Sequence, residues 1–427
     1  MHDNGLDVRV FSQSEAQLGE YTVLTRLSRE TGISTKELRL AAQSQPVVTE
    51  FAVADLLVPM IAFKTAPYQA CLESMRLARI TKAKEGKLHT EWPLNKITFD
   101  KVTYQFGLGG IHSSDAPLVC HADEDMALVD FDVTSFYPAI IIALGIRPDH
   151  IPAEFTAILD DIRRKRVEAK RNKNKVVAQA MKIVINAVFG KSNSPYSALY
   201  GPRCTYTVTI LGQMLLLMLI EEMTVAGATV ISANTDGILV RYRRDRETAI
   251  MDAKSAWEQR TQLSLESTPY RFYARTSVND FIAANADNAD VKRKGVFAYG
   301  DEGKADGIVI AKALEAYFMH GVDPKEFIGR HDIAADFMYY QRAKDKMVFK
   351  ADGQELPQTI RWYAATQGIK LIRTGGKSGP TSLPNGNRAR LALTLPGSHA
   401  SALVDLDREH YVAEAKEIIA KIRGVDR

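Results

Sequence analysis

The chain has 427 residues, of which 46% are hydrophobic and 25% are charged, a composition typical of a globular protein with two or three domains that excludes a disordered or fibrous chain. The formal net charge is only +4, so the overall composition gives little indication of a polyanionic partner. The three cysteines, Cys71, Cys120 and Cys204, are widely spaced, which argues against a disulfide framework or a zinc site and favours a reducing cytoplasm.

The N-terminal part of the chain is predicted to be a mixture of helix and loop. Helical patterns occur at 28–43 and 66–86, and no spacing typical of a catalytic site is found among them. The first ten residues do not have the pattern of a signal peptide. From residue 104 the sequence becomes strand-like and glycine-punctuated, and strands and helices then alternate to about residue 300. We therefore expect a domain boundary near residue 105.

The predicted strand "ALVDFDV" (127–133) places two carboxylates at the junction with a helix. Side chains alternate along a strand, so its apolar residues face one way while Asp130 and Asp132 face the other. Pro138 suits the first turn of the following helix, and a threonine or serine just before that helix suits its cap. Taken alone, this spacing also fits a solvent-facing strand followed by a capped helix.

A basic segment follows at 160–175, with eight Lys and Arg residues against three acidic ones. Such a balance indicates a local site for a polyanion, although charge runs are more often solvated surfaces. Arg166 and Lys170 are four residues apart and share one face of a predicted helix. Four other cations of the segment are interpreted as a solvated surface, namely Arg163, Arg164, Lys173 and Lys175.

The helix predicted at 176–191 has an apolar stripe and a second face with a cation, an amide and an aromatic ring. The predicted core stripe consists of Val177, Met181, Val184 and Val188. The second face carries Lys182, Asn186 and Phe189. Lys182 could converge with Arg166 and Lys170 on a triphosphate, because ammonium and guanidinium groups both bind phosphate oxygens.

The longest apolar run is "ILGQMLLLMLI" (210–220). It is shorter than a bilayer requires and contains Gln213. We therefore expect a soluble protein without a membrane partner.

The segment 228–244 is predicted to be a β-hairpin with Asp236 at its tip. An Asp-Gly pair in a turn is also explained by turn chemistry alone, because both residues tolerate a positive φ. The domain nevertheless combines this carboxylate with Asp132 and with basic helices between the two. Mg²⁺ takes one or two carboxylates together with substrate phosphates, so the pattern predicts a platform for a pair of ions about 3.5–4 Å apart.

After residue 300 the chain is predicted to be helical at 311–321 and 323–344. The stretch 372–391 is rich in Gly, Pro, Ser and Asn and is interpreted as a long mobile loop in a basic C-terminal region.

Three of these segments resemble, in order, motifs of the family B DNA polymerases. "DVTSFYP" (132–138) is similar to motif A, "KIVINAVFGK" (182–191) to motif B and "ANTDGI" (233–238) to motif C. With "RVEAK" (166–170), "GLGGIHSS" (107–114) and "KRKGVF" (292–297), the resemblance covers about 105–300. It leans toward compact bacteriophage members. Only 43 residues separate Pro138 from Lys182, which does not favour the protein-primed members with their insertion at this point.

The resemblance implies an α/β (α+β) fold in the form of a right hand, with an antiparallel palm sheet and helical fingers and thumb. It implies a palm at 106–148 and 191–305, fingers at 149–190 and a thumb at 306–427. Residues 1–105 would be an N-terminal region linking to a missing exonuclease domain, since no acidic metal-binding constellation is found there. The protein would then lack its own proofreading.

The resemblance also implies the site residues. Asp132 and Asp236 would be the catalytic metal ligands for two Mg²⁺ ions, or Mn²⁺ in their place, with the backbone carbonyl of Val133. The triphosphate clamp would consist of Arg166, Lys170 and the catalytic Lys182. The residues near the incoming nucleotide would be Asn186, Phe136 and, under the sugar, Tyr137. Lys292 and Lys294 would follow the primer-template DNA, with plain surface lysines as the alternative.

Three positions depart from the family pattern, one of them Gly237, which replaces a common serine of motif C. Asn234 stands where motif C usually has its first carboxylate, and Phe189 lacks the hydroxyl of the usual tyrosine. An asparagine accepts a hydrogen bond but brings no charge, so metal affinity and rate are in question.

The resemblance therefore predicts a DNA-templated DNA polymerase that extends a primer 3′-hydroxyl with dNTPs in phage-type DNA replication. It would act in the cytoplasm, that of the host if the protein is phage-encoded, with a separate exonuclease polypeptide or other replication proteins as further partners. The alternative is a non-catalytic, polymerase-like DNA-binding subunit, motivated by Asn234 and the missing exonuclease. A primer-making or template-independent transferase is a third interpretation.

Overall fold

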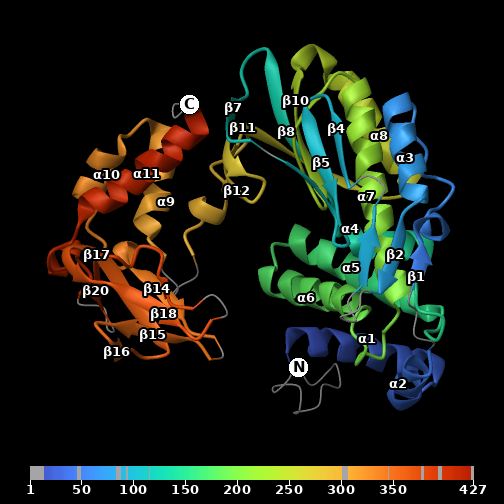
Figure 1. The fold of residues 1–427 in the computed structure, drawn as a ribbon. Helices are drawn as coiled ribbons and strands as arrows, with labels where there is room; N and C mark the ends of the chain where they lie inside the picture. The colour runs from blue at the N-terminus through green and yellow to red at the C-terminus, as the bar shows by residue number, and fades with distance from the viewer. Residues whose placement is uncertain are drawn as a thin grey trace. The chain divides into compact units, whose positions relative to one another are not determined.

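The computed structural model describes residues 14–45, 50–82, 88–92, 95–114, 116–300, 306–344, 346–376, 379–392 and 397–424, drawn in Figure 1. The chain divides into two compact units, the first made of 1–114 and 123–269 and the second of 115–122 and 270–427. Position 105 therefore does not separate two compact units, because both sides of it lie in the first unit. The division into palm, fingers and thumb stays a prediction.

The first unit is a mixture of helices and antiparallel sheet. Its helices are α1 (Glu15–Thr31), α2 (Thr35–Gln43), α3 (Ala66–Arg76), α4 (Phe136–Leu144), α5 (Glu154–Arg171), α6 (Lys175–Lys191), α7 (Pro202–Val225) and α8 (Glu247–Thr261). Its strands are β1 (Glu50–Ala52), β2 (Arg79–Lys82), β3 (Leu88–Glu91), β4 (Lys96–Phe99), β5 (Val102–Phe106), β6 (Ile111–Ser113), β8 (Met126–Val133), β9 (Thr229–Asn234), β10 (Gly237–Arg243) and the first part of β11 (Leu265–Ser277).

The strand β8 lies between two antiparallel neighbours. The sheet order in the first unit is β11-β8-β10-β9-β6-β5-β4. Along β8, Val129, Phe131 and Val133 are buried, whereas Asp130 and Asp132 are half-buried. This confirms the predicted alternation, and the hairpin predicted at 228–244 is present as β9 and β10.

The helix α7 forms the centre of the core. It is longer than the apolar run at 210–220, and by length and composition it could cross a membrane; 83% of its most apolar window is nevertheless buried inside the protein. It packs against α4, α8, β9 and β10. Its apolar composition is therefore explained by burial in the core. The sequence argument that the apolar run at 210–220 is shorter than a bilayer requires does not hold for the whole helix, which is long enough to span one.

The N-terminal predictions hold only in part. The helical pattern at 28–43 covers the end of α1 and all of α2, which are separated at Gly32, whose φ is +76°. The helix predicted at 66–86 ends at Arg76, and 79–82 instead forms β2 between β1 and β3. The prediction of helix and loop alone missed these strands, because strands this short give little periodicity.

The second unit contains helices and small antiparallel sheets. Its helices are α9 (Ile308–His320), α10 (Pro324–Arg330) and α11 (Arg408–Arg423). Its strands are β7 (Leu118–His121), the later part of β11, β12 (Asp280–Asn285), β13 (Val291–Lys294), β14 (Tyr339–Arg342), β15 (Val348–Ala351), β16 (Gln354–Glu355), β17 (Thr359–Ile369), β18 (Leu371–Thr374), β19 (Thr381–Ser382) and β20 (Ala389–Leu391).

The prediction of a helical thumb at 306–427 is wrong for its middle part. Two sheets, β14-β17-β20 and β16-β15-β18-β19, lie between the helices. In β17 the buried residues include Ile360, Trp362 and Tyr363, and β-branched and aromatic side chains favour strands. The predicted loop at 372–391 likewise contains most of β18 and all of β19 and β20 in its described residues.

Candidate active site

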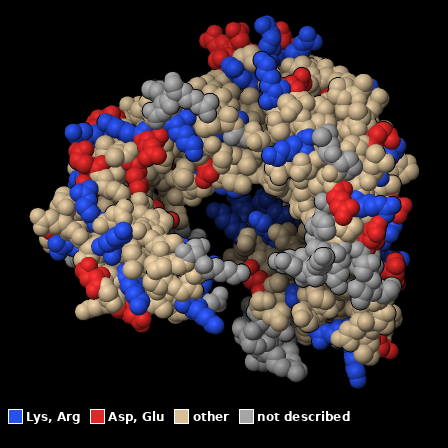
Figure 2. Space-filling view, in the orientation of Figure 1, with Lys and Arg blue, Asp and Glu red and all other residues tan. Residues whose placement is uncertain are grey.

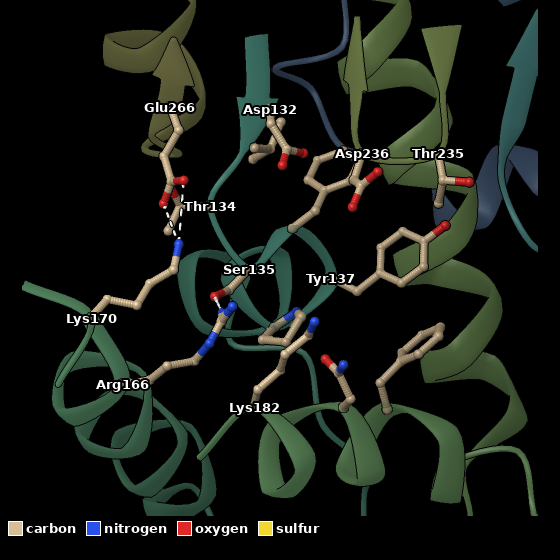
Figure 3. A pocket seen from close by; sticks show the side chains of 15 residues that line it. Asp132, Thr134, Ser135, Tyr137, Arg166, Lys170, Lys182, Thr235, Asp236 and Glu266 are labelled. Carbon is tan, nitrogen blue, oxygen red and sulfur yellow. Dashed lines mark hydrogen bonds and ion pairs between the residues drawn. The ribbon is translucent and has the colours of Figure 1, made fainter. Parts of the chain in front are cut away.

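A cavity of about 400 Å³ in the first unit brings the motif residues together (Figure 3). The predicted site residues that line it are Asp132, Val133, Phe136, Tyr137, Arg166, Lys170, Lys182, Asn186 and Asp236. They come from β8, α4, α5, α6 and the β9–β10 hairpin, over about a hundred residues of chain. Figure 3 shows Asp132 and Asp236 entering from the strands, opposite the cations of α5 and α6.

The two carboxylates lie at the ends of adjacent strands. Asp132 is directly opposite Gly237 in the β8–β10 pairing, and the Val133 backbone N–H donates to the Asp236 carbonyl oxygen at 2.8 Å. A Cβ on Gly237 would lie 2.9 Å from the Phe131 carbonyl oxygen and 3.3 Å from Asp132 Oδ1. Glycine is therefore required at 237 for close approach of β10 to Asp132, and not for a positive φ.

The strained residue of the hairpin tip is Thr235. Its φ is +42°, which is unfavourable for a β-branched side chain. Its backbone N–H donates to the Ile111 carbonyl oxygen at 2.9 Å, and the preceding Asn234 accepts from His112 Nδ1 at 2.8 Å. The strand β6 thus holds the turn that presents Asp236, and stored strain of this kind is common at functional sites.

The serine before α4 does not cap that helix through its side chain. Ser135 is the N-cap residue with φ +56°, and its side chain makes no capping hydrogen bond. Its hydroxyl instead accepts from the Arg166 guanidinium. This contact ties α5 to the junction between β8 and α4, and Pro138 lies in the first turn of α4 as predicted.

A third carboxylate, which the sequence analysis missed, also lines the cavity. Glu266 in β11 is directly opposite Asp132 in β8. Its carboxylate pairs with Lys170 Nζ at 3.0 Å, and the two side chains are 53% and 47% exposed. An ion pair this exposed contributes little to stability, so Lys170 can exchange this partner for another anion at low cost.

The helix α6 presents Lys182 and Asn186 to the cavity. Both residues are exposed, whereas the buried residues of this helix are Val184, Ile185, Ala187 and Val188. The predicted core stripe is therefore correct for Val184 and Val188 and wrong for Val177, which is 38% exposed near the start of the helix. Met181 is partly buried against the core.

Tyr137 is fixed at three points. Its hydroxyl donates to the Gly109 carbonyl oxygen at 2.5 Å, and its ring lies 4.7 Å from that of Phe189 and 5.6 Å from that of Phe136. Burial and then the charge of Asp236 raise the pKa of the Tyr137 hydroxyl, so it remains a donor at neutral pH. Gly110, with φ +151°, leaves room for that hydroxyl, because a Cβ there would approach it to 3.1 Å.

The donor set fits a metal that brings phosphate ligands with it. Among the described residues, no group of three or more His, Cys, Asp or Glu side chains is placed to hold a metal ion by itself. Asp132 and Asp236 provide two carboxylates on adjacent strands in one cavity. One or two carboxylates completed by substrate phosphates are the usual ligands of Mg²⁺.

The last two predicted residues lie outside this cavity. Lys292 and Lys294 are exposed on β13 in the second unit, and the ammonium group of Lys292 lies 5.8 Å from the centre of the Phe281 ring. On the face of the second unit in Figure 2, described Lys and Arg side chains are interspersed with Asp and Glu. The DNA-binding role of the two lysines stays a prediction.

Comparison with known proteins gives matches of two kinds, a curated protein and solved structures. No family model matches the chain. A segment of 66 residues, 16% of this chain, is 39% identical to the "Uncharacterized mitochondrial protein ymf34" of Marchantia polymorpha and covers 85% of that protein. Among solved structures, the chain is similar to the family B DNA polymerase of the hyperthermophilic archaeon Pyrobaculum calidifontis, with a TM-score of 0.44 and 14% identity. That match covers 83% of this chain, which spans half the length of the archaeal one.

Proposed function

We propose that this chain is a DNA-templated DNA polymerase that extends a primer with dNTPs. Through one segment, the chain belongs to the same family as the uncharacterized protein ymf34. One observation carries the proposal. Two carboxylates at strand ends and three cations from two helices, predicted from separate motifs, line the same cavity. Positioning and neutralisation of a triphosphate require such an arrangement of opposite charges.

The proposed metal ligands are Asp132, Asp236 and the carbonyl oxygen of Val133, which would hold two Mg²⁺ ions or Mn²⁺ in their place. Such ions activate an attacking oxygen and stabilise a leaving one in phosphoryl transfer. The two aspartates hold their positions through strand pairing and the Val133–Asp236 backbone hydrogen bond. The protein therefore does not have to reorganise its carboxylates when substrate arrives.

The proposed triphosphate clamp consists of Arg166, Lys170 and Lys182. Arg166 already donates to Ser135 and is thus held at the edge of the cavity, while Lys170 leaves Glu266 to contact phosphate. Their charges offset the negative charge that develops on the phosphates and on the departing pyrophosphate.

The proposed nucleotide contacts are Phe136, Tyr137 and Asn186. Tyr137 is fixed by Gly109 and Phe189, so its ring can form a rigid wall beneath a sugar. A wall of this kind would admit a 2′-hydrogen and exclude a 2′-hydroxyl, because forcing extra atoms into a packed site is costly.

The wider setting is part of the same proposal. Primer-template DNA would run along a palm, fingers and thumb divided as the sequence predicts, with Lys292 and Lys294 on its phosphates. The chain would lack its own proofreading and act in phage-type replication in the cytoplasm, with a separate exonuclease polypeptide or other replication proteins.

Asn234 motivates the second candidate, a non-catalytic DNA-binding subunit, since the hairpin tip lacks the charge of a second acid. A primer-extension assay with Mg²⁺, a primer-template and all four dNTPs separates the two. A polymerase lengthens the primer according to the template; a binding subunit retards the DNA in a gel and extends nothing. Extension of the primer without a template would instead indicate a template-independent transferase.

A further inference from the structure

The N-terminal helix α1 lies directly against α6, the helix that presents Lys182 and Asn186 (Figure 1). The approach is close at Gly19 in α1. A Cβ there would lie 2.4 Å from Ala187 Cβ and 3.1 Å from Val184 Cα. Ordinary contact at a Cβ begins near 3.4 Å, so any residue larger than glycine requires α1 and α6 to move apart by about an ångström.

The next residue of α1 fixes the chain just beyond the end of α6. Glu20 is only 7% exposed. Its Oε1 accepts from the Ser197 hydroxyl and from the Ala198 backbone N–H, both at 2.9 Å, and its Oε2 lies 3.4 Å from Lys191 Nζ at the end of α6. A buried carboxylate with three donors is a specific anchor, because an unsatisfied buried charge is costly.

A third contact joins α1 to α5, the helix that carries Arg166 and Lys170. Arg26 in α1 donates to Asp161 in α5 at 2.7 Å. The helices α5 and α6 also pack on each other. The helix α1 therefore anchors both α5 and α6, which carry the cations of the site, through a close glycine contact, a buried carboxylate and an ion pair.

We propose that Glu20 and Gly19 are positioning residues. They fix the position of α6 relative to the nucleotide cavity, and thereby the positions of Lys182 and Asn186 in it. This inference rests on the proposed polymerase function. Ala187 and Val184, the residues that Gly19 contacts, flank Asn186 in sequence, so a shift of the helix at that contact moves Asn186 with it. On this view α1 belongs to the machinery of the site, and is more than a link to another domain.

The size of the effect follows from the precision that catalysis requires. A displacement of about 1 Å in a group that positions substrate can cost about a hundred-fold in rate. Among the described elements, the extensive contacts of α1 are with α6 and α5, and no contact of that extent joins α1 to β8 or to the β9–β10 hairpin. Disturbance of α1 should therefore weaken nucleotide binding first and leave DNA binding unaffected.

The test compares Glu20→Gln and Gly19→Ala with two matched controls in the full chain. Glu30→Gln removes an exposed carboxylate of the same helix, which lies 3.6 Å from Arg26. Gly329→Ala adds a methyl group to a helical glycine with nothing within 4 Å of the added carbon. The measured quantities are kcat and the KM for a single dNTP, the Kd for primer-template, and hydrogen exchange of the 175–191 amides.

We expect KM for the dNTP to rise about ten-fold or more in both test variants, with a smaller fall in kcat and an unchanged Kd for DNA, while both controls match the wild type. Hydrogen exchange of the 175–191 backbone amides should be faster in Glu20→Gln than in Glu30→Gln. An unchanged KM, or equal losses in test and control variants, overturns the proposal. If Gly19→Ala does not fold, Glu20→Gln alone decides, because a glutamine keeps the volume and one acceptor.

Failure of the proposed function gives a different pattern. A wild-type chain that extends no primer removes the polymerase assignment, and the exchange measurement then decides whether α1 holds α6. A wild type that extends primers, with a KM for dNTP that no α1 variant changes, removes the positioning role and leaves the polymerase assignment in place.

Discussion

The hydroxyl of Tyr137 donates a 2.5 Å hydrogen bond to the carbonyl oxygen of Gly109. This bond links the first turn of α4 to the glycine-rich loop before β6, across a gap that Gly110 keeps open. The aromatic ring is thereby held in one orientation at the wall of the cavity. A fixed ring can discriminate between sugars by shape, which a mobile one does less well.

Replacement of Tyr137 by alanine should increase incorporation of ribonucleotides relative to deoxyribonucleotides. The proposed overpacking by a 2′-hydroxyl costs roughly 1–3 kcal/mol, equivalent to about five- to hundred-fold in selectivity. The efficiency ratio for rGTP and dGTP opposite C measures it. Tyr137→Phe, which loses only the hydrogen bond to Gly109, should change this efficiency ratio less. An unaltered ratio in Tyr137→Ala would contradict the proposal that the Tyr137 ring excludes a 2′-hydroxyl.

Asp132→Ala and Asp236→Ala should each abolish primer extension and leave DNA binding nearly intact. Both carboxylates are proposed metal ligands, whereas affinity for duplex DNA comes mostly from Lys and Arg contacts to phosphates. Extension assays and gel shifts measure the two properties. Asp245→Ala, which removes an exposed carboxylate paired with Arg243, is the control, and near-wild-type extension by either test variant would rule out the metal assignment.

Asn234→Asp should lower the Mg²⁺ concentration required for half-maximal extension. The new carboxylate keeps an oxygen acceptor for His112, which lies 2.8 Å from Asn234 Oδ1, and adds a charge beside the turn that presents Asp236. Partners that orient or polarise a metal ligand typically change metal affinity about ten-fold or more. A Mg²⁺ titration of extension by both proteins measures the effect, and identical midpoints would show that position 234 does not influence the metals.

The purified chain should show no 3′→5′ exonuclease activity. The reason is that the sequence before residue 105 lacks the acidic metal-binding constellation of such a domain. Incubation of a labelled single-stranded oligonucleotide with Mg²⁺ tests this. Shortening that persists in Asp132→Ala would reveal a second metal site elsewhere in the chain.

Asp336 should make the second unit sensitive to acid. Burial raises the pKa of Asp336, but hydrogen bonds from His331 at 2.5 Å and Lys312 at 2.7 Å outweigh it, so the pKa lies below 3.8. A lowered folded-state pKa contributes stability that is fully present above the unfolded value and lost as the pH falls through the folded one.

Thermal unfolding followed between about pH 5 and pH 2 should therefore show a steeper loss of stability in the wild type than in Asp336→Asn. At neutral pH the same variant should also be less stable than the wild type, because Asp336→Asn removes the carboxylate that pairs with Lys312, whose side chain is 27% exposed. Glu326→Gln, which removes an exposed partner of Arg330, serves as the control. Parallel pH profiles for wild type and Asp336→Asn would refute the assignment.

Local patterns could predict which side chains share a face, and they did so for most of the candidate site. The period of two along β8 placed Asp130 and Asp132 away from the core, and the period of 3.6 placed Lys182 and Asn186 on one face of α6. The same approach failed for Val177 and for the strands at 371–391, because helix ends and short strands carry too few residues for a period to emerge.

By itself, the sequence therefore determined the faces of single elements and the order of the motifs along the chain. Only the tertiary structure decided that Glu266 lies opposite Asp132 and that the Ser135 hydroxyl accepts a hydrogen bond from Arg166 instead of capping α4. It also decided that α1 contacts α6 through Gly19 and Glu20. Periodicity arises from the geometry of one helix or strand. Strand order and helix docking depend instead on pairing between distant segments, which no local period encodes.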